Sequence, residues 1–405
     1  MKLSPSVFRS LIFLFFSLSV VTMQAQGPKR VIPDSIRISL LTCASGEEIY
    51  SLFGHTAIRY ENYTRGIDAV FNYGIFNFNA PNFILRFALG ETDYQLGVTD
   101  YERFAAEYYY LERDVWQQEL NLTVQEKGKL VMLLEENYRP ENRIYRYNFF
   151  YDNCATRPRD LIEKSIDGTL QYAGDMTDTD SGISFRDLLH KYSKGHPWSR
   201  FGMDLCMGSQ ADRTINRRLM MFVPFYVQEY FNQARIVNKE GETRPLVLNE
   251  EKIIVTGNEE AEQPSDGFTP MQAALLLLIL TAAATIYGIR RMKTLWGIDF
   301  ALFFAAGTAG CILAFLALFS QHPAVSPNYL LFVFHPLHLF CLPCMLNRVR
   351  KRKRSRYMLA NFVVLTLFIL LWPVIPQRFP LAVLPLALCL LIRSTSNLIL
   401  TYDKK

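Results

Sequence analysis

The chain has 405 residues, 50% of them hydrophobic, and a formal net charge of +5. That length allows two or three domains. The weak positive charge does not indicate a nucleic-acid partner, because the densest basic run, residues 348–356, lies between two apolar segments. The hydrophobic residues are concentrated in the last third of the chain, so we expect a water-exposed domain followed by a membrane domain.

The N-terminus has the pattern of a secretory signal peptide. Lys2 and Arg9 precede the apolar stretch LIFLFFSLSVV, and small residues follow up to Ala25. This stretch is too short for an ordinary spanning helix, so residues 1–25 are predicted to be a signal peptide, with an uncleaved anchor as the alternative. Export would place residues 27–265 in the periplasm.

Five apolar segments predict a transmembrane domain over 271–394. The loops at 290–293 and 348–356 are rich in Lys and Arg, whereas the alternate loops carry almost no charge. Because basic loops stay on the cytoplasmic side, the sequence predicts an inner-membrane protein with a periplasmic 27–265 domain and a cytoplasmic tail, 395–405. The predicted spans are Met271–Ile289, Phe300–Ser320, Tyr329–Leu346, Met358–Ile375 and Phe379–Ile392.

The periplasmic domain is predicted to be α+β, followed by an all-α bundle of five membrane helices. Strand-like alternation is found in SIRISLLTCA, HTAIRY, AVFNYGIF, VWQQELNLT, RIYRYNFFYD and EEKIIVTG, and the first of these is expected to be half-buried. Helical spacing is found in DYERFAAEYYYLER, TVQEKGKLVMLLEENY and ATRPRDLIEKSI, the second with Thr123 as its cap. The stretch ENYTRGID between the second and third strands favours a hairpin loop.

Cys154 lies in YNFFYDNCATRPRDLIEK, where an aromatic strand gives way to a helix. Pro158 fits the first turn of that helix, and Thr156 is a candidate cap. Cys154 is therefore expected at a helix N-terminus, where free N–H groups and the helix dipole favour a thiolate. Cys43 and Cys206 are the other exported cysteines, so at least one of the three thiols is unpaired. Cys154 is the candidate nucleophile.

A cysteine nucleophile needs a base, usually a histidine oriented by a third polar group. His55 directly follows a glycine at the start of a predicted strand, whereas His190 and His196 lie in ordinary surface contexts. Antiparallel pairing of HTAIRY with AVFNYG puts a residue near 72–74 opposite His55, and a shift of one residue would reverse the face. Asn72 is the candidate to orient the imidazole, and Tyr73 is the alternative.

A helix-borne cysteine with a sheet-borne histidine is the papain-type arrangement, here with the histidine first. That permuted order resembles lecithin:retinol acyltransferase-like proteins, which handle acyl chains. A closer resemblance covers nearly the whole chain: SLFGHTAIRY, FNYGIFNF, YNFFYDNCATRPRDLIEK and GSQADR, followed by the spans, resemble the Bacteroidota lipoprotein N-acyltransferases of the Lnb type. The patterns FGHTAxR and YNxxxDNCATRxRD are specific when found together in this order.

The resemblance implies transfer of an acyl chain from a membrane phospholipid to the α-amino group of a diacylglyceryl-cysteine lipoprotein. Its catalytic pair matches Cys154 and His55, whereas Asn72 remains an inference from strand pairing. The Cys154 thiolate would attack the phospholipid ester and form a thioester, from which the lipoprotein amine takes the acyl group. N–H groups at the helix start, together with the Asn153 amide, would stabilise the oxyanion. No cofactor or metal is expected.

Several other residues are candidates for binding lipid. Arg59, Arg157 and Arg159 suit a phosphate headgroup, although charged residues beside a helix are often plain surface. The aromatic stretches NFILRFALG and EYYYLER either contact the bilayer surface or pack in the core. Within the predicted spans, His335 and His338 either grip a substrate or form interhelical hydrogen bonds.

Two other functions remain open on the residues alone. A membrane-anchored thiol peptidase or amidase acting on cell-wall peptide would use the same pair, Cys154 and His55. Such an enzyme needs only a tether, whereas five spans suit substrates that reside in the bilayer. A non-catalytic membrane sensor with a papain-like head is the second alternative, and the presence of both residues argues against it.

Overall fold

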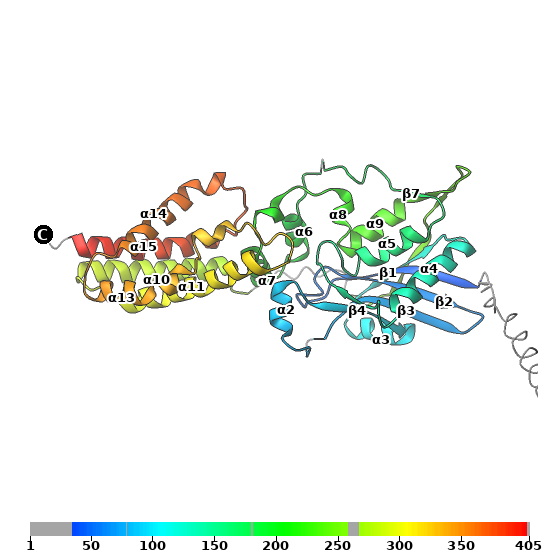
Figure 1. The fold of residues 1–405 in the computed structure, drawn as a ribbon, viewed down its shortest axis with the longest axis horizontal. Helices are drawn as coiled ribbons and strands as arrows, with labels where there is room; N and C mark the ends of the chain where they lie inside the picture. The colour runs from blue at the N-terminus through cyan, green and yellow to red at the C-terminus, as the bar shows by residue number, and fades with distance from the viewer. Residues whose placement is uncertain (1–34, 78, 180, 258–266, 403–405) are drawn as a thin grey trace, which may run out of the picture.

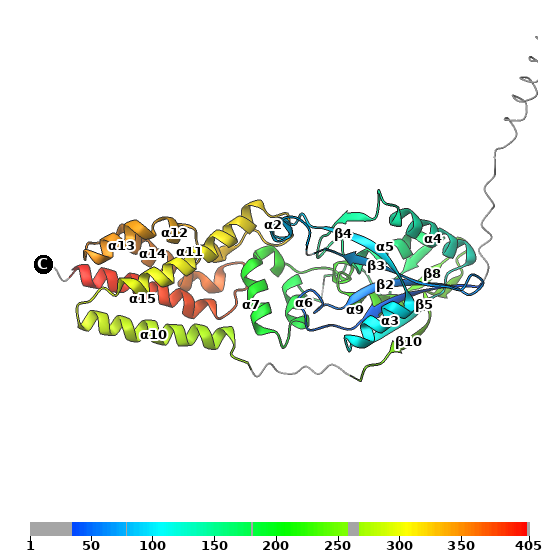
Figure 2. The same cartoon turned by 90° about the horizontal axis from the view of Figure 1, so that it is seen from below.

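The computed structural model describes residues 35–77, 79–179, 181–257 and 267–402, so the predicted signal peptide lies outside the described residues. The chain forms a mixed α/β part and a helical part (Figure 1). Viewed from below, the strands and the long helices run along the same long axis, with α2 (Phe83–Leu89) and α7 (Pro197–Cys206) between the two parts (Figure 2).

The α/β part is built on a seven-stranded sheet in which every neighbouring pair of strands is antiparallel. The predicted hairpin is present at its centre, with the turn between Asn62 and Ile67. The strand order is β10-β5-β1-β2-β3-β4-β6. The strands are β1 (Ile36–Cys43), β2 (His55–Asn62), β3 (Ile67–Ile75), β4 (Asp93–Asp100), β5 (Val115–Leu120), β6 (Ile144–Arg146) and β10 (Val247–Ile254).

Helices cover both faces of this sheet. On one face α4 (Val124–Tyr138), α5 (Thr156–Ser165) and α9 (Pro224–Gln233) contact β-strands, and on the other α3 (Tyr101–Tyr110) does so. The expectation that the first strand is half-buried is therefore wrong, because β1 has a buried residue at every position except Arg37. Two cores result, one with Leu40, Leu130, Ile162 and Phe231, the other with Leu41, Cys43, Phe104 and Tyr108.

The helix starts follow from local capping. Thr123 forms the predicted cap of α4: its hydroxyl accepts from the Glu126 N–H, and the Glu126 carboxylate accepts from the Thr123 N–H. At α5 the expected cap is displaced. Thr156 is already helical, and Asn153 Oδ1 accepts instead from the N–H groups of Ala155 and Thr156, both at 2.9 Å.

Smaller elements complete the α/β part. A three-stranded sheet, β7-β8-β9, lies beside the main sheet. The remaining elements are β7 (Thr169–Gln171), β8 (Arg235–Val237), β9 (Thr243–Pro245), α6 (Phe185–Tyr192), η1 (Ser209–Asp212) and α8 (Arg217–Met220).

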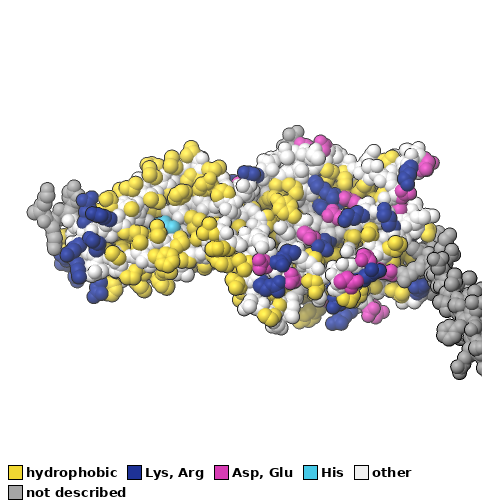
Figure 3. All heavy atoms as spheres, viewed as in Figure 1, with side chains coloured by type: hydrophobic (Ala, Val, Ile, Leu, Met, Phe, Trp, Pro, Cys, Tyr) yellow, Lys and Arg dark blue, Asp and Glu magenta, His cyan; other side chains and the backbone are white. Residues whose placement is uncertain are grey.

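The helical part has four helices that are long and apolar enough to cross a membrane, or five spans if a bent pair counts as one, within the described residues. The bent pair, Tyr329–Phe340 and Leu342–Arg350, turns by 75° where a single third span was predicted. Hydrophobic side chains cover this part, and Lys and Arg gather at its far end (Figure 3). The helices are α10 (Pro270–Arg290), α11 (Trp296–Phe319), α12 (Leu337–Phe340), α13 (Leu342–Arg350), α14 (Arg356–Leu371) and α15 (Val383–Tyr402), with the 3-10 turns η2 (Tyr329–Phe332) and η3 (Trp372–Val374).

Polar contacts join helices inside the apolar bundle. Arg393 on α15 pairs with Asp299 on α11 at 2.6 Å and donates to Thr285 Oγ1 on α10 at 3.0 Å. His338 bonds the Tyr357 hydroxyl at 2.6 Å through Nδ1 and the Val333 carbonyl at 2.9 Å through Nε2. These bonds support the interhelical alternative for His338, because both of its ring nitrogens are engaged.

The two parts are joined by hydrogen bonds and ion pairs. After α11, the Gln321 N–H donates to the Leu89 carbonyl at 2.8 Å, and His322 Nε2 lies 2.6 Å from the Phe87 carbonyl. Before α15, Arg378 pairs with Asp187 at 2.6 Å and with Asp212 at 3.1 Å. The α/β part therefore sits against the same end of the bundle through α2, α6 and η1.

Candidate active site

The site lies where β2 begins and β3 ends. Gly54 has φ of +79°, and a Cβ there would lie 2.7 Å from the Cys43 carbonyl oxygen, so only glycine fits this turn. The turn places His55 as the first residue of β2, opposite Cys43 on β1. Asn72 on β3 pairs with Ala57, which puts Asn72 diagonal to His55 on the same face of the sheet.

His55 is held by Asn72. The Nε2 of His55 lies 2.6 Å from Asn72 Oδ1, and because an amide oxygen only accepts, Nε2 carries the proton in this arrangement. The lone pair then resides on Nδ1, the nitrogen that can act as a base. The alternative residue, Tyr73, is buried on the other face, where its hydroxyl accepts from Asn137 Nδ2 at 3.1 Å.

Gly74 brings the cysteine and the histidine together. Its φ is +95°, and the register between β3 and β4 shifts between Asn72 and Ile75. A Cβ on Gly74 would lie 3.5 Å from Cys154 Cβ and 3.9 Å from His55 Cε1, so both side chains border the space that the missing side chain leaves. The backbone N–H of Thr56, the residue after His55, lowers the pKa of the Cys154 thiol, although burial raises it more.

Burial controls the charges of this pair. It raises the pKa of the Cys154 thiol to about 11, although the N–H groups of Thr56 and Cys154 favour the thiolate. It also lowers the pKa of His55 to about 4, although the hydrogen bond that the ring donates to Asn72 favours the charged ring. At neutral pH the free site therefore holds a neutral thiol and a neutral imidazole. The expectation that the helix start would leave a lowered thiol pKa is wrong, because desolvation is the larger effect.

Arg113 is a residue of this site that the sequence did not indicate. Its positive charge favours the Cys154 thiolate and opposes protonation of His55, lowering both pKa values. The guanidinium donates to the Ala44 carbonyl from Nε at 2.8 Å and from Nη2 at 2.5 Å, just beyond the end of β1. No sequence signal marks it, because the contact joins the turn before β5 to the end of β1.

The Asn153 amide is committed to structure. Its Nδ2 donates to the carbonyls of Phe149 and Phe222, both at 2.8 Å, and its Oδ1 caps α5. Both N–H bonds of the amide are therefore used, and the predicted oxyanion role of Asn153 is not supported. Asn153 instead fixes the loop that carries Cys154.

The three candidate arginines are also paired. Arg59 is buried, bonds Asp68 at 2.6 Å and lies over the ring of Tyr101. Arg157 forms two bonds to Asp152, at 2.6 and 2.7 Å, and Arg159 bonds Asp160 at 2.8 Å. All seven cysteines are free, and burial raises the pKa of Cys43 to about 12. His190 pairs with Asp204 at 2.9 Å. The carboxylate partners weaken the case for phosphate binding by these arginines.

The fold and the site define a class of protein: a membrane protein whose mixed α/β domain carries a cysteine, a histidine and an asparagine at one end of its sheet. Two family models match, the Lnb N-terminal periplasmic domain over residues 24–190 and the Lnb transmembrane domain over residues 262–405, together about three quarters of the chain. The chain belongs to the Lnb family.

Membership makes this an inner-membrane protein with a periplasmic N-terminal domain and a transmembrane C-terminal domain, related to lipoprotein N-acylation and consistent with an acyltransferase. No curated protein and no solved structure matches the chain. The papain-like character of the periplasmic domain therefore stays a prediction.

Proposed function

We propose that the protein is a lipoprotein N-acyltransferase that carries the acyl chain as a thioester on Cys154. The observation that supports this most directly is that the side chains of Cys154 and His55 both lie next to Gly74, while Asn72 Oδ1 accepts a hydrogen bond from Nε2 of the ring. A nucleophile, a base and an orienting amide are the parts that acyl transfer needs. The family implies lipoprotein substrates and membrane lipids, and we take the donor to be a phospholipid and the acceptor to be a diacylated lipoprotein.

In the first half-reaction His55 Nδ1 takes the thiol proton as the Cys154 sulfur attacks the ester carbonyl of a membrane phospholipid. Neutral partners suit this route, because proton transfer and attack can occur together without a preformed thiolate. The backbone N–H groups of Thr56 and Cys154, together with the charge of Arg113, favour the negative charge that develops on the Cys154 sulfur. The C–O bond breaks, and the lysophospholipid oxygen takes the proton back from His55.

In the second half-reaction the α-amino group of the lipoprotein cysteine attacks the thioester. His55 accepts the proton that the amine loses, the C–S bond breaks, and the proton returns to the Cys154 sulfur. The products are the amide and the free thiol, so the site is restored without a cofactor. Asn72 keeps the same ring nitrogen facing the reaction in both halves.

We also propose that the C-terminus is cytoplasmic. The Lys and Arg residues of the bundle gather at the end opposite the α/β domain (Figure 3). The basic segment 348–354 covers the last turn of α13 and the residues that follow it. Basic segments are retained on the cytoplasmic side. This orientation puts α2 and the sheet ends that carry the site next to the outer face of the membrane.

The test is the N-terminus of a reporter lipoprotein, read by mass spectrometry in a host without other N-acyltransferases. Cys154→Ala should leave two acyl chains and a free amine, whereas the unaltered protein adds a third, amide-linked chain. Cys206→Ala is the matched control, because Cys206 lies on α7, outside the site, and should leave N-acylation intact. Full N-acylation by Cys154→Ala would refute the proposal, and altered cell-wall peptides with unaltered lipoproteins would favour the amidase alternative.

A further inference from the structure

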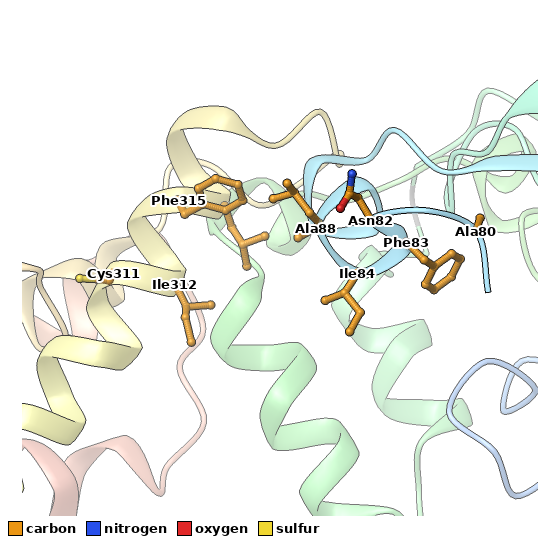
Figure 4. Close-up of a pocket in the computed structure, with 10 residues that line it drawn as sticks. Ala80, Asn82, Phe83, Ile84, Ala88, Cys311, Ile312 and Phe315 are labelled. Atoms are coloured by element: carbon orange, nitrogen blue, oxygen red, sulfur yellow. The ribbon is translucent and has the colours of Figure 1, made fainter. Parts of the chain in front are cut away.

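An apolar groove separates α2 from the outer end of α11. It has a volume of about 740 Å³ and is lined by Phe83, Ile84, Leu85 and Ala88 on one side and by Ile312 and Phe315 on the other. Figure 4 shows the two helices as opposite walls, with no charged side chain among the labelled residues. The volume lies within the ~300–1,000 Å³ of ordinary ligand sites.

The α2 wall is held firmly although α2 itself has no buried residue. Gly90 ends the helix at φ +72°, and a Cβ there would lie 2.9 Å from the backbone nitrogen of His322, so the α2 end packs tightly on the chain after α11. The hydrogen bonds from Gln321 to Leu89 and between His322 and Phe87 fix the same contact. The groove is thus a built feature of the domain junction.

The groove is continuous with the surface that faces lipid. Its α11 wall belongs to a membrane span, where Ile312 is 55% exposed. Ile84 and Leu85 on α2 are 84% and 51% exposed, which in water is unfavourable for side chains of this size. Hydrocarbon is the medium around α11, so a hydrocarbon chain can enter the groove without crossing water.

Aromatic rings connect this groove with the nucleophile. The ring of Phe83 at the groove stacks with that of Phe76, with 6.0 Å between the ring centroids. The centroids of Phe76 and Tyr94 are 5.1 Å apart, and those of Tyr94 and Tyr147, which stack, are 4.0 Å apart. Phe76, Tyr147 and Cys154 pack against one core cluster that contains Tyr94. Burial raises the pKa of Tyr94 to about 12, and the nearby Cys154 adds to this rise.

We propose that the groove between α2 and α11 receives an acyl chain of the donor phospholipid, and that Phe83, Phe76 and Tyr94 lead from it to Cys154. This inference rests on the proposed function and adds to it the route of the donor. A phosphate headgroup does not suit the lining, which offers only Asn82 as a polar side chain. The carbonyl of a chain lying in the groove would lie at the Phe83 end, because Phe83 contacts Phe76 and Phe76 contacts Tyr94 on the way to the site.

The test uses the purified full-length protein in vesicles of phosphatidylethanolamine with mixed acyl-chain lengths and no lipoprotein acceptor. Intact-protein mass spectrometry then reports which chains reach Cys154. Ala88→Trp and Ile312→Trp each narrow the groove from one wall. In both variants the amount of Cys154 thioester with the longest acyl chain should fall about tenfold relative to that with the shortest, because a pocket discriminates against each surplus methylene by about that factor. Ile279→Trp on α10, where Ile279 is exposed but lies outside the groove, should match the unaltered protein.

The outcomes separate this inference from the proposed function. No thioester on Cys154 in the unaltered protein would overturn the function itself. An unchanged chain distribution in both groove variants, with normal alkylation of Cys154 by iodoacetamide as the check of folding, would overturn the groove while leaving the function standing.

A second measurement does not depend on groove variants. In the Cys154→Ala protein, a phosphatidylethanolamine with a diazirine at mid-chain should label peptides of residues 80–88 on irradiation, and a headgroup diazirine should not. Equal labelling of these peptides by both probes, or labelling of bundle helices without them, would overturn the groove.

Discussion

The hydrogen bond between Asn72 and His55 gives the sharpest test of the site. Asn72→Ala removes the Oδ1 acceptor that lies 2.6 Å from Nε2 and leaves the ring free to turn or change tautomer. A hydrogen bond to a ring that becomes charged during the reaction contributes about 2 kcal/mol more to the transition state than to the ground state. Since 1.4 kcal/mol is a factor of ten, kcat for thioester formation should fall about 30-fold.

The assay follows Cys154 thioester in phospholipid vesicles by quenched-flow mass spectrometry. Because Asn72 contacts the imidazole and no substrate is expected to touch it, KM should stay unchanged while kcat falls. Asn62→Ala is the matched control: Asn62 is a buried asparagine of the same hairpin, but it bonds Tyr60 and Arg65. Equal losses in both variants would mean that Asn72 is only structural, and an unaltered kcat in Asn72→Ala would refute the role of the bond.

Two further predictions concern charge. Arg113 lowers the pKa values of both Cys154 and His55, so Arg113→Gln should raise both pKa values and slow the alkylation of Cys154 at pH 8. Arg113→Lys keeps the charge and should recover most of the alkylation rate. Equal alkylation rates in the two variants would refute an electrostatic role. The pKa of His55 is lowered from 6.5 to about 4, so the base stays neutral on acidification and thioester formation should persist until the pH nears 4. Amide formation should decline progressively below about pH 8, because a growing fraction of the acceptor amine is protonated, and a common acidic limit for both half-reactions would contradict this.

Much of the site was predictable because its signals are local. The glycine before His55 marks a turn, and the structure explains why this residue is a glycine: Gly54 has φ of +79° and lies close to the Cys43 carbonyl oxygen. Alternating patterns predict β2 and β3, and their antiparallel pairing is enough to bring Asn72 to the ring. The DNCATRP stretch marks the start of α5, although Asn153 caps it in place of Thr156. Each of these predictions needs only contacts between neighbours in sequence or in one hairpin.

The predictions that the structure weakens or contradicts concern the surroundings of the pair. Arg59, Arg157 and Arg159 look available in sequence, but Asp68, Asp152 and Asp160 pair with them, in the case of Arg59 after the chain has folded back into a hairpin. The thiol pKa is raised because the packing of the whole domain excludes water from Cys154, an effect that no local motif reports.

The sequence by itself predicted the membrane segments, the orientation of the chain and the candidate residues Cys154 and His55, because apolar runs, basic loops and strand alternation are patterns over short distances along the chain. Only the tertiary structure decided that Arg113 joins the site and that α2 lies exposed against α11. The stretch NFILRFALG has the composition of a core helix, and whether it meets protein or lipid depends on which element packs beside it. That neighbour, α11, lies more than two hundred residues further along the chain, so folding places it there and local composition does not.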